Sequence, residues 1–259
     1  MPSVARLSVS PVKGLGLVHP EALELHANGI PGDRAFYLAD AADGRMVNGK
    51  LAGTLVQVAP AYDAATGRLS LTLPGGAVVE DDASALGAPV ETSFYGRPVT
   101  GRFVEGPFSA ALSELAGRAL RLVRTDATSA ACDCLHPVSV LSTASCAELA
   151  RQSGDPRLAD DRRFRMHVLL DGCALAHEED TWAGRELRVG EAVIRLVGPL
   201  PRCLITGQDP DTGEGDHGAL KAIVAYRGQP REGAIDFGMY ADIVTPGRVC
   251  VGDRVELVG

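Results

Sequence analysis

The segment Glu186-Leu187-Arg188-Val189-Gly190-Glu191-Ala192-Val193-Ile194-Arg195-Leu196-Val197 contains two short strand patterns on either side of a glycine. Apolar and polar residues alternate over 186–189 and apolar residues dominate 192–197, so both parts are predicted as β-strands. Ten further segments have the same strand character: Val4 to Val9, Ala22 to Leu25, Ala35 to Leu38, Leu55 to Ala59, Arg68 to Leu73, Arg97 to Phe103, Leu120 to Arg124, Val138 to Ser142, His167 to Leu170 and Arg254 to Val258. The chain is therefore predicted to be mainly β.

Glycine-rich turns such as Asn28-Gly29 and Pro74-Gly75-Gly76 separate these segments, a pattern typical of β-barrels and sandwiches. Helical periodicity occurs in three places, and the sequence predicts helices over Phe108 to Ala116, Ala144 to Gln152 and Ala219 to Tyr226. The strand pattern stops between Asp126 and Cys134. We therefore expect two β-rich domains with a few short helices, over residues 1–125 and 126–259.

The composition limits which partners and which location are expected for the protein. The 259 residues carry a net charge of −8 with an isoelectric point near 5.3, which disfavours nucleic acid or an anionic membrane as the main partner. A local basic pocket for an anionic ligand is compatible with that charge. The first residues resemble a strand and not a secretion signal, and no apolar run reaches the ~20 residues needed to span a bilayer. We expect a cytoplasmic protein that binds small molecules.

The six cysteines are few and scattered, which argues against a disulfide-stapled secreted domain. Cys132 and Cys134 form a C-x-C pair, and the chain contains no C-x-x-C pair, so a structural zinc or iron–sulfur site is not expected. Cys132, Cys134, Cys146 and Cys173 are predicted to be reduced, partly buried thiols.

Cys203 has the most distinctive surroundings of the six. It lies in Pro199-Leu200-Pro201-Arg202-Cys203-Leu204-Ile205-Thr206-Gly207-Gln208-Asp209-Pro210-Asp211-Thr212-Gly213, directly after a predicted strand, where functional loops often occur. The neighbouring Arg202 would favour the thiolate, which is both a nucleophile and a soft metal ligand. Thr206 and Asp209 can orient the loop through hydrogen bonds to the backbone. An inert cysteine beside a turn is the more common situation for such a residue.

Three basic segments could recognise an anion. Lys13 lies in Ser10-Pro11-Val12-Lys13-Gly14-Leu15-Gly16, where glycines let a phosphate approach the backbone, although the Walker spacing is absent. Arg34 follows Gly32-Asp33 and offers a bidentate fork that Asp33 could hold in place. The alternatives are a turn with a solvated lysine and a surface ion pair.

The third basic segment is Asp160-Asp161-Arg162-Arg163-Phe164-Arg165-Met166-His167. We expect it to be a strand entrance, whose alternation would place Arg163 and Arg165 on one face. Such an entrance in an acidic protein suggests an anion pocket, and a surface arginine cluster paired with the aspartates is the alternative. A lone histidine such as His167 is more often a core or surface residue than a ligand.

Together these motifs follow one order along the chain. They are Ser10-Pro11-Val12-Lys13-Gly14, Gly32-Asp33-Arg34, Met46-Val47-Asn48, Leu141-Ser142-Thr143-Ala144-Ser145, Arg163-Phe164-Arg165, Glu179-Asp180-Thr181-Trp182, Arg202-Cys203 with Thr206, Asp209-Pro210-Asp211-Thr212-Gly213, Phe237-Gly238-Met239-Tyr240 and Val251-Gly252-Asp253. In this order they resemble the MOSC family, domains related to the C-terminal part of molybdenum cofactor sulfurases, with its N-terminal β-barrel extension. The resemblance covers nearly the whole chain and implies a MOSC barrel beside a barrel-like N-terminal domain.

The branch that the chain resembles most comprises the amidoxime-reducing proteins, which reduce N-hydroxylated compounds at a molybdenum–pterin centre. The resemblance implies that Cys203 ligates molybdenum and that Asp209 lies close to the cofactor. It implies further cofactor contacts from Lys13, Arg34, Ser145, Arg163, Arg165, His167, Arg202 and Thr206, with the lysine and Arg34, Arg163 and Arg165 around the phosphate.

Three features depart from the family pattern. His167 stands where the branch usually has asparagine, which introduces a group that titrates near neutral pH. No ferredoxin-like domain follows Gly259, so a separate electron-donor protein, a ferredoxin- or flavin-type reductase, is expected. No pyridoxal-phosphate domain is present, so that cofactor is not expected.

Two other functions stay open at this stage. A sulfur carrier or sulfurtransferase would use a persulfide on Cys203 without metal. A protein of a specialised pathway would use the same anion pocket for a different phosphorylated or sulfur-containing ligand.

Overall fold

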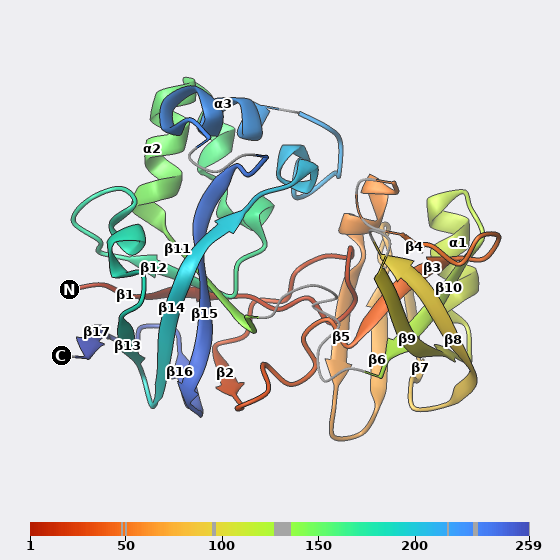
Figure 1. The fold of residues 1–259 in the computed structure, drawn as a ribbon. Helices are drawn as coiled ribbons and strands as arrows, with labels where there is room; N and C mark the ends of the chain where they lie inside the picture. Colours follow the sequence, from red (N-terminus) through yellow and green to blue (C-terminus); the bar gives the residue numbers. More distant parts are fainter. Residues whose placement is uncertain are drawn as a thin grey trace.

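The computed structural model describes residues 1–47, 49, 51–94, 97–126, 136–216, 218–229 and 233–258. The described residues form two bodies that lie side by side (Figure 1). We call them the barrel body, which contains both ends of the chain and helices α2 and α3, and the second body, which contains strands β3 to β10 and helix α1.

The barrel body is built on a seven-stranded sheet. Its order is β1 (Ser3–Leu7), β12 (Val168–Asp171), β11 (Val138–Ser142), β15 (Asp236–Thr245), β14 (Ala192–Pro201), β13 (Glu186–Val189) and β17 (Val255–Val258). The two edge strands also meet, since Val4 N–H donates to Asp253 O and Val255 N–H donates to Pro2 O, both at 2.9 Å. The sheet therefore closes on itself, and apolar side chains from every strand fill its interior.

The first two strands of the chain belong to the barrel body. β1 pairs with β12, and β2 (Ala22–Leu25) pairs with β16 (Gly247–Cys250). The chain then enters the second body at β3 and leaves it after β10. The segments that cross between the bodies include the lysine turn and Gly32-Asp33-Arg34, and these crossings position the site described below. A division of the chain at residues 125 and 126 stays a prediction.

The second body has two sheets and one helix. The larger sheet has the order β4 (Met46–Val47), β3 (Phe36–Asp40), β10 (Leu120–Thr125), β9 (Arg97–Val104) and β8 (Leu86–Phe94), and the smaller has β5 (Ala59–Asp63), β6 (Arg68–Thr72) and β7 (Val78–Asp82). Helix α1 (Phe108–Ala116) buries Phe108 and Leu112 in the core between them.

Two helices cover one end of the barrel body (Figure 1). α2 (Thr143–Ser153) begins at Ser142, whose side chain accepts a hydrogen bond from Ser145 N–H, and α3 (Gly218–Arg227) packs beside it. Between these helices and the sheet lies a third core, in which Phe164 and Phe237 stack at 4.6 Å between ring centroids.

The predicted fold class, mainly β with a barrel and a few short helices, is confirmed. The strand predicted over Leu55 to Ala59 is wrong, because a short 3-10 helix, η1 (Gly53–Gln57), occupies most of it. Leu55 N–H donates to Ala52 O and Val58 N–H donates to Leu55 O, so Leu55 and Val58 are buried with a spacing of three and not of two.

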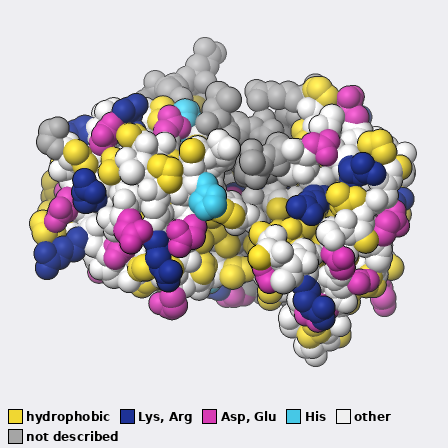
Figure 2. Space-filling model, turned by 90° about the horizontal axis from the view of Figure 1, so that it is seen from below, with side chains coloured by type: hydrophobic (Ala, Val, Ile, Leu, Met, Phe, Trp, Pro, Cys, Tyr) yellow, Lys and Arg dark blue, Asp and Glu magenta, His cyan; other side chains and the backbone are white. Residues whose placement is uncertain are grey.

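Two general expectations concern the surface and the thiols. Within the described ranges no helix is long and apolar enough to cross a membrane. Acidic and basic side chains intermix over the face seen from below (Figure 2). Cys146, Cys173, Cys203 and Cys250 are free thiols, whereas Cys132 and Cys134 lie outside the described residues.

Candidate functional site

Residues from both bodies line a cleft of about 170 Å³. Gly14, Gly16 and His19 line it from the lysine turn and the residues after it, and 56–59 line it from the second body. The barrel body contributes Arg162, Arg163, Arg165, Ile205, Gln208, Asp209, Pro210 and Asp211. The cleft therefore brings together the lysine turn, the arginine segment and the loop that follows Cys203.

The ion pair of Asp33 and Arg34 lies at the junction of the two bodies, where Gly32-Asp33-Arg34 crosses between them. Arg34 Nη1 donates to Asp33 Oδ2 at 2.5 Å, and His167 Nε2 lies 3.0 Å from the same oxygen. The side chains of Asp33 and His167 are only 3% and 8% exposed. Although burial alone would raise it, the pKa of the Asp33 carboxyl is held far below its usual range by Arg34 and His167. Asp33 is therefore an anion that holds Arg34.

Arg165 reaches the same junction from the barrel body. Its Nη2 donates to Ser10 Oγ at 2.8 Å and to Leu15 O at 2.7 Å, and Ser10 N–H donates to Asp33 Oδ1 at 2.8 Å. Burial and the neighbouring Arg34 charge lower the pKa of Arg165 to about 10, so it is still a cation at neutral pH.

Both arginines have a left-handed backbone, with φ of 48° at Arg34 and 54° at Arg165. Such a conformation costs on the order of 1–3 kcal/mol in a residue other than glycine and is common at ligand sites. The surrounding hydrogen bonds therefore keep two adjacent cations in a strained arrangement.

The lysine turn is joined to this cluster through its backbone. Arg34 N–H donates to Ser10 O, and Lys13 N–H donates to Phe36 O, both at 2.8 Å. Gly14 has φ of 93°, which lets the chain turn directly after Lys13. The structure thus brings the Lys13, Arg34 and Arg165 segments together.

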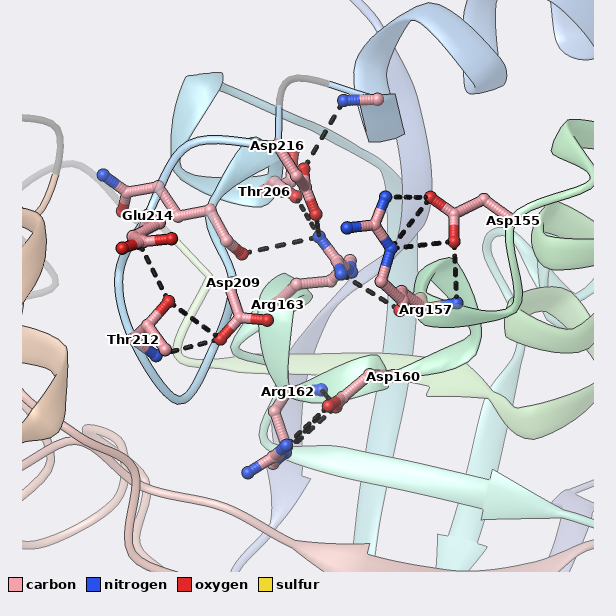
Figure 3. A network of polar contacts seen from close by, with 12 residues as sticks. Asp155, Arg157, Asp160, Arg162, Arg163, Thr206, Asp209, Thr212, Glu214 and Asp216 are labelled. Carbon is pink, nitrogen blue, oxygen red and sulfur yellow. Dashed lines mark hydrogen bonds and ion pairs between the residues drawn. The ribbon is translucent and has the colours of Figure 1, made fainter.

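Arg163 also lines the cleft, but its guanidinium bonds to other parts of the protein. Its Nη1 donates to Thr206 O at 2.9 Å and to Asp216 Oδ2 at 3.1 Å, and its Nη2 donates to Arg157 O at 3.0 Å (Figure 3). The segment does lie directly ahead of a strand, β12, but the predicted alternation is wrong, because residues Asp161–Phe164 form the 3-10 helix η3, which Asp160 caps. Arg163 and Arg165 therefore point to different neighbours, and a phosphate contact from Arg163 stays a prediction.

Cys203 is exposed at the start of η5 (Leu204–Gly207), the short helix whose Ile205 lines the cleft. Thr206 N–H and Oγ1 both donate to Cys203 O, at 3.1 and 3.0 Å, and Thr206 is fully buried. Arg202 donates from Nη2 to Phe164 O and contacts Met166 Sδ from Nη1. Thr206 and Arg202 thus hold the loop on both sides of the thiol.

Asp209 closes the turn after η5. Its Oδ1 accepts a hydrogen bond from Thr212 N–H at 2.9 Å (Figure 3). The same oxygen accepts one from Asp211 N–H, also at 2.9 Å. Chiefly the bond from Thr212 lowers the pKa of the Asp209 carboxyl, so it is ionised at neutral pH. The predicted turn-forming role agrees with these contacts.

The turn also packs against the second body. Gln208 Nε2 donates to Gly49 O at 2.7 Å, and Gln57 Nε2 donates to Thr212 O at 3.0 Å. A Cβ on Gly213 would lie 1.9 Å from Gly53 O. Close backbone contact between the bodies therefore sets the position of the loop, which the sequence did not predict.

Ser145 is not among the residues that line the cleft. It is fully buried, its Oγ donates to Glu179 Oε1 at 2.7 Å, and Ser142 Oγ donates to Glu179 Oε2 at 2.9 Å. Glu179, with no exposed surface, anchors the start of α2. These contacts indicate a structural role for Ser145, and a cofactor contact from it stays a prediction. Glu179 and His19, a lining residue of the cleft, were not predicted as site residues.

The fold and the site together define a closed β-barrel protein with a second β-rich body, a basic cleft and an exposed thiol beside it. Residues 130–256 match the MOSC domain and residues 1–102 match the MOSC N-terminal β-barrel domain, so the chain belongs to the MOSC family.

Named relatives match about half of the chain. Mitochondrial amidoxime-reducing component 1 of Mus musculus is 35% identical over 130 residues, which is 48% of this chain and 37% of that protein. Mitochondrial amidoxime reducing component 2 of Bos taurus is 36% identical over the same shares. The match thus spans little more than a third of these relatives. The crystal structure of the YuaD protein from Bacillus subtilis aligns over 99% of this chain and 96% of that one, with 15% identity and a TM-score of 0.45.

Proposed function

We propose that this protein binds the molybdenum cofactor and reduces N-hydroxylated or N-oxygenated small molecules. The observation that carries the proposal is that one cleft is lined by Arg165, part of a half-buried two-arginine cluster, and by the loop that presents Cys203. The names of the amidoxime-reducing relatives support the substrate class.

The residues present fit such a cofactor. Its phosphate needs fixed cations, and Lys13, Arg34 and Arg165 would hold it. Its metal needs a soft ligand, and Cys203 would supply a thiolate. No cluster of three or more His, Cys, Asp and Glu side chains that could hold a metal ion occurs within the described ranges, so the thiolate would be a single protein ligand. The cofactor supplies two-electron redox chemistry when bound.

The protein's own groups would prepare this chemistry. Thr206 and Arg163 keep the Cys203 loop rigid, because they bond the loop's carbonyl groups from a buried position. Ionised Asp209 would orient groups in the cleft as a hydrogen-bond acceptor, since its second oxygen Oδ2 is not used by the turn bonds to Oδ1. Reduction of an N-hydroxyl group to an amine consumes two electrons and two protons and releases water. The electrons would come from a separate donor protein, and a cytoplasmic location stays a prediction.

The test is metal and pterin analysis of the full chain made in a cofactor-competent host. We expect stoichiometric molybdenum and pterin in the wild type and loss of molybdenum in Cys203→Ser. Cys250→Ser, at a partly exposed thiol, is the matched control and should keep both. Absence of metal and pterin from the wild type would overturn the proposal.

A second candidate function is favoured by the exposure of the Cys203 thiol. A sulfurtransferase would carry a persulfide there, and cyanide would release that sulfur as thiocyanate. Thiocyanate release from metal-free wild-type protein, lost in Cys203→Ser, would support this function over the first.

A further inference from the structure

We propose that His167 is a positioning residue: it fixes the direction of Arg34 through Asp33, and does not itself contact the anion. This inference rests on the proposed anion site at Arg34 and Arg165. It differs from the direct cofactor contact that the family resemblance implies for His167.

The imidazole ring is fixed from the barrel side. Ser139 N–H donates to His167 Nδ1 at 3.1 Å, and Ser139 Oγ lies 3.0 Å from the same nitrogen. Because a backbone N–H can only donate, Nδ1 is an acceptor and the neutral ring carries its proton on Nε2. Ser139 lies on β11, a central strand of the barrel, so the ring has a rigid support.

The Nε2 proton is directed at Asp33. His167 Nε2 lies 3.0 Å from Asp33 Oδ2, the oxygen that also accepts from Arg34 Nη1. Arg34 Nη1 lies 2.6 Å from His167 Nε2, so the guanidinium is in direct contact with the ring edge. Two donors thus share one carboxylate oxygen, and the ring sets where the second donor sits.

Both ring nitrogens are used by protein groups, and the side chain is 8% exposed. The ring therefore has no polar atom left for a ligand. The same carboxylate bonds Ser10 N–H through Oδ1, and Ser10 Oγ accepts from Arg165. His167 is therefore connected to Arg34 through the shared Oδ2, whereas Arg165 is held separately by Ser10 Oγ and Leu15 O.

The experiment compares Arg34→Ala, His167→Phe, His167→Gln and the double variant R34A/H167F. The Kd for inorganic phosphate is measured by calorimetry on cofactor-free full-length protein, and pterin content on protein from a cofactor-competent host. Side-chain ¹⁵N resonances of Arg34, assigned by their loss in Arg34→Ala, report its environment without any ligand. Thermal unfolding identifies variants that do not fold.

We expect Arg34→Ala to weaken phosphate binding about tenfold or more, as for loss of a charge-assisted pair. His167→Phe should weaken it about fivefold and shift the Arg34 resonances. In His167→Gln the amide nitrogen replaces Nε2 as donor to Asp33, so binding should stay within about twofold of the wild type. The double variant should bind no more weakly than Arg34→Ala alone, because the histidine acts through the arginine.

If the increase in the phosphate Kd of the double variant equals the product of the two single increases, the inference is overturned. Such a result would mean a separate contact between His167 and the anion. Unchanged Arg34 resonances in His167→Phe would also overturn it. If Arg34→Ala binds phosphate like the wild type, the proposed anion site fails, and the resonances alone then decide whether His167 positions Arg34. If His167→Phe does not fold, His167→Gln tests the inference. A shift of the Arg34 ¹⁵N resonances together with loss of phosphate binding in that variant would contradict the proposed donor role of His167.

Discussion

Arg163 and Arg165 are separated by one residue, yet their guanidinium groups bond to different parts of the protein. Arg163 donates to the carbonyl of Thr206 beneath the Cys203 loop, whereas Arg165 donates to Ser10 and Leu15 at the junction of the two bodies. The turn of η3 followed by the left-handed Arg165 causes this divergence. One arginine thus supports the thiol loop while the other lies beside Arg34 at the junction of the two bodies.

Replacing Arg163 by alanine should destabilise the whole protein. The side chain is 1% exposed, and its loss removes the buried hydrogen bonds that it donates to Asp216 and to the carbonyl groups of Thr206 and Arg157. We expect the free energy of unfolding to fall by about 3–5 kcal/mol, the range for breaking a buried ion pair. Urea denaturation measures the change. Arg195→Ala, which removes an exposed ion pair with Glu186, is the control and should change it by less than about 1 kcal/mol. An equally small change in Arg163→Ala would contradict the prediction.

Gly213→Ala should loosen the Cys203 loop. Gly213 has φ of 76°, and an added Cβ would lie 1.9 Å from the Gly53 carbonyl oxygen, so the two bodies must separate there. Gly75→Ala is a matched control, because Gly75 also has positive φ (89°) but has no atom within 4 Å of an added Cβ. Hydrogen exchange should show faster exchange over 204–213 in the first variant alone. Exchange over 204–213 that is no faster in Gly213→Ala than in Gly75→Ala would contradict the prediction.

His177 should make stability depend on pH below neutrality. Burial, together with the Arg227 charge, lowers the pKa of His177 to about 4 from the usual value of 6.5. The unfolded chain therefore binds a proton in this window that the folded protein does not, and stability decreases as pH falls from about 6.5 to about 4. His177→Gln should flatten this part of the curve, measured by urea midpoints, while His26→Gln, at an exposed position, should not. An unchanged slope in His177→Gln would count against the assignment.

The Ser145→Ala variant should distinguish a structural role of Ser145 from a direct contact with the cofactor. The hydroxyl donates to the buried Glu179 and accepts from His177 N–H, so its loss should cost about 1–3 kcal/mol of unfolding free energy. Pterin and molybdenum content per folded protein should stay at the wild-type level, because Ser145 is fully buried and its hydroxyl is bonded to Glu179 and His177. Ser153→Ala at the other end of α2 is the control for stability. Reduced pterin content in folded Ser145→Ala protein would instead support a direct contact between Ser145 and the cofactor.

Short-range sequence patterns predicted the secondary structure correctly where an element shows its own clear periodicity. The bounds of β2, β11, β13 and α1 agree with those predicted, because alternation or helical spacing is visible within each segment. β15 was not predicted, since this central strand is paired on both sides and contains Gly238, which obscures the alternation. Leu55 to Ala59 was predicted as a strand because a short apolar run fits a strand and a 3-10 turn equally well.

The residue types of the candidate site were recognisable from the chain alone: a thiol after a strand, a lysine beside a glycine, and arginines in an acidic protein. Their arrangement was not. Ser10 and Arg165 are 155 positions apart, and Asp33 and His167 are 134 apart, yet both pairs are hydrogen-bonded. Such contacts depend on how β1 and β2 join the barrel before the chain enters the second body. Short-range periodicity carries no information on that path, so the closure of the barrel and the packing of the two bodies decided which cations meet.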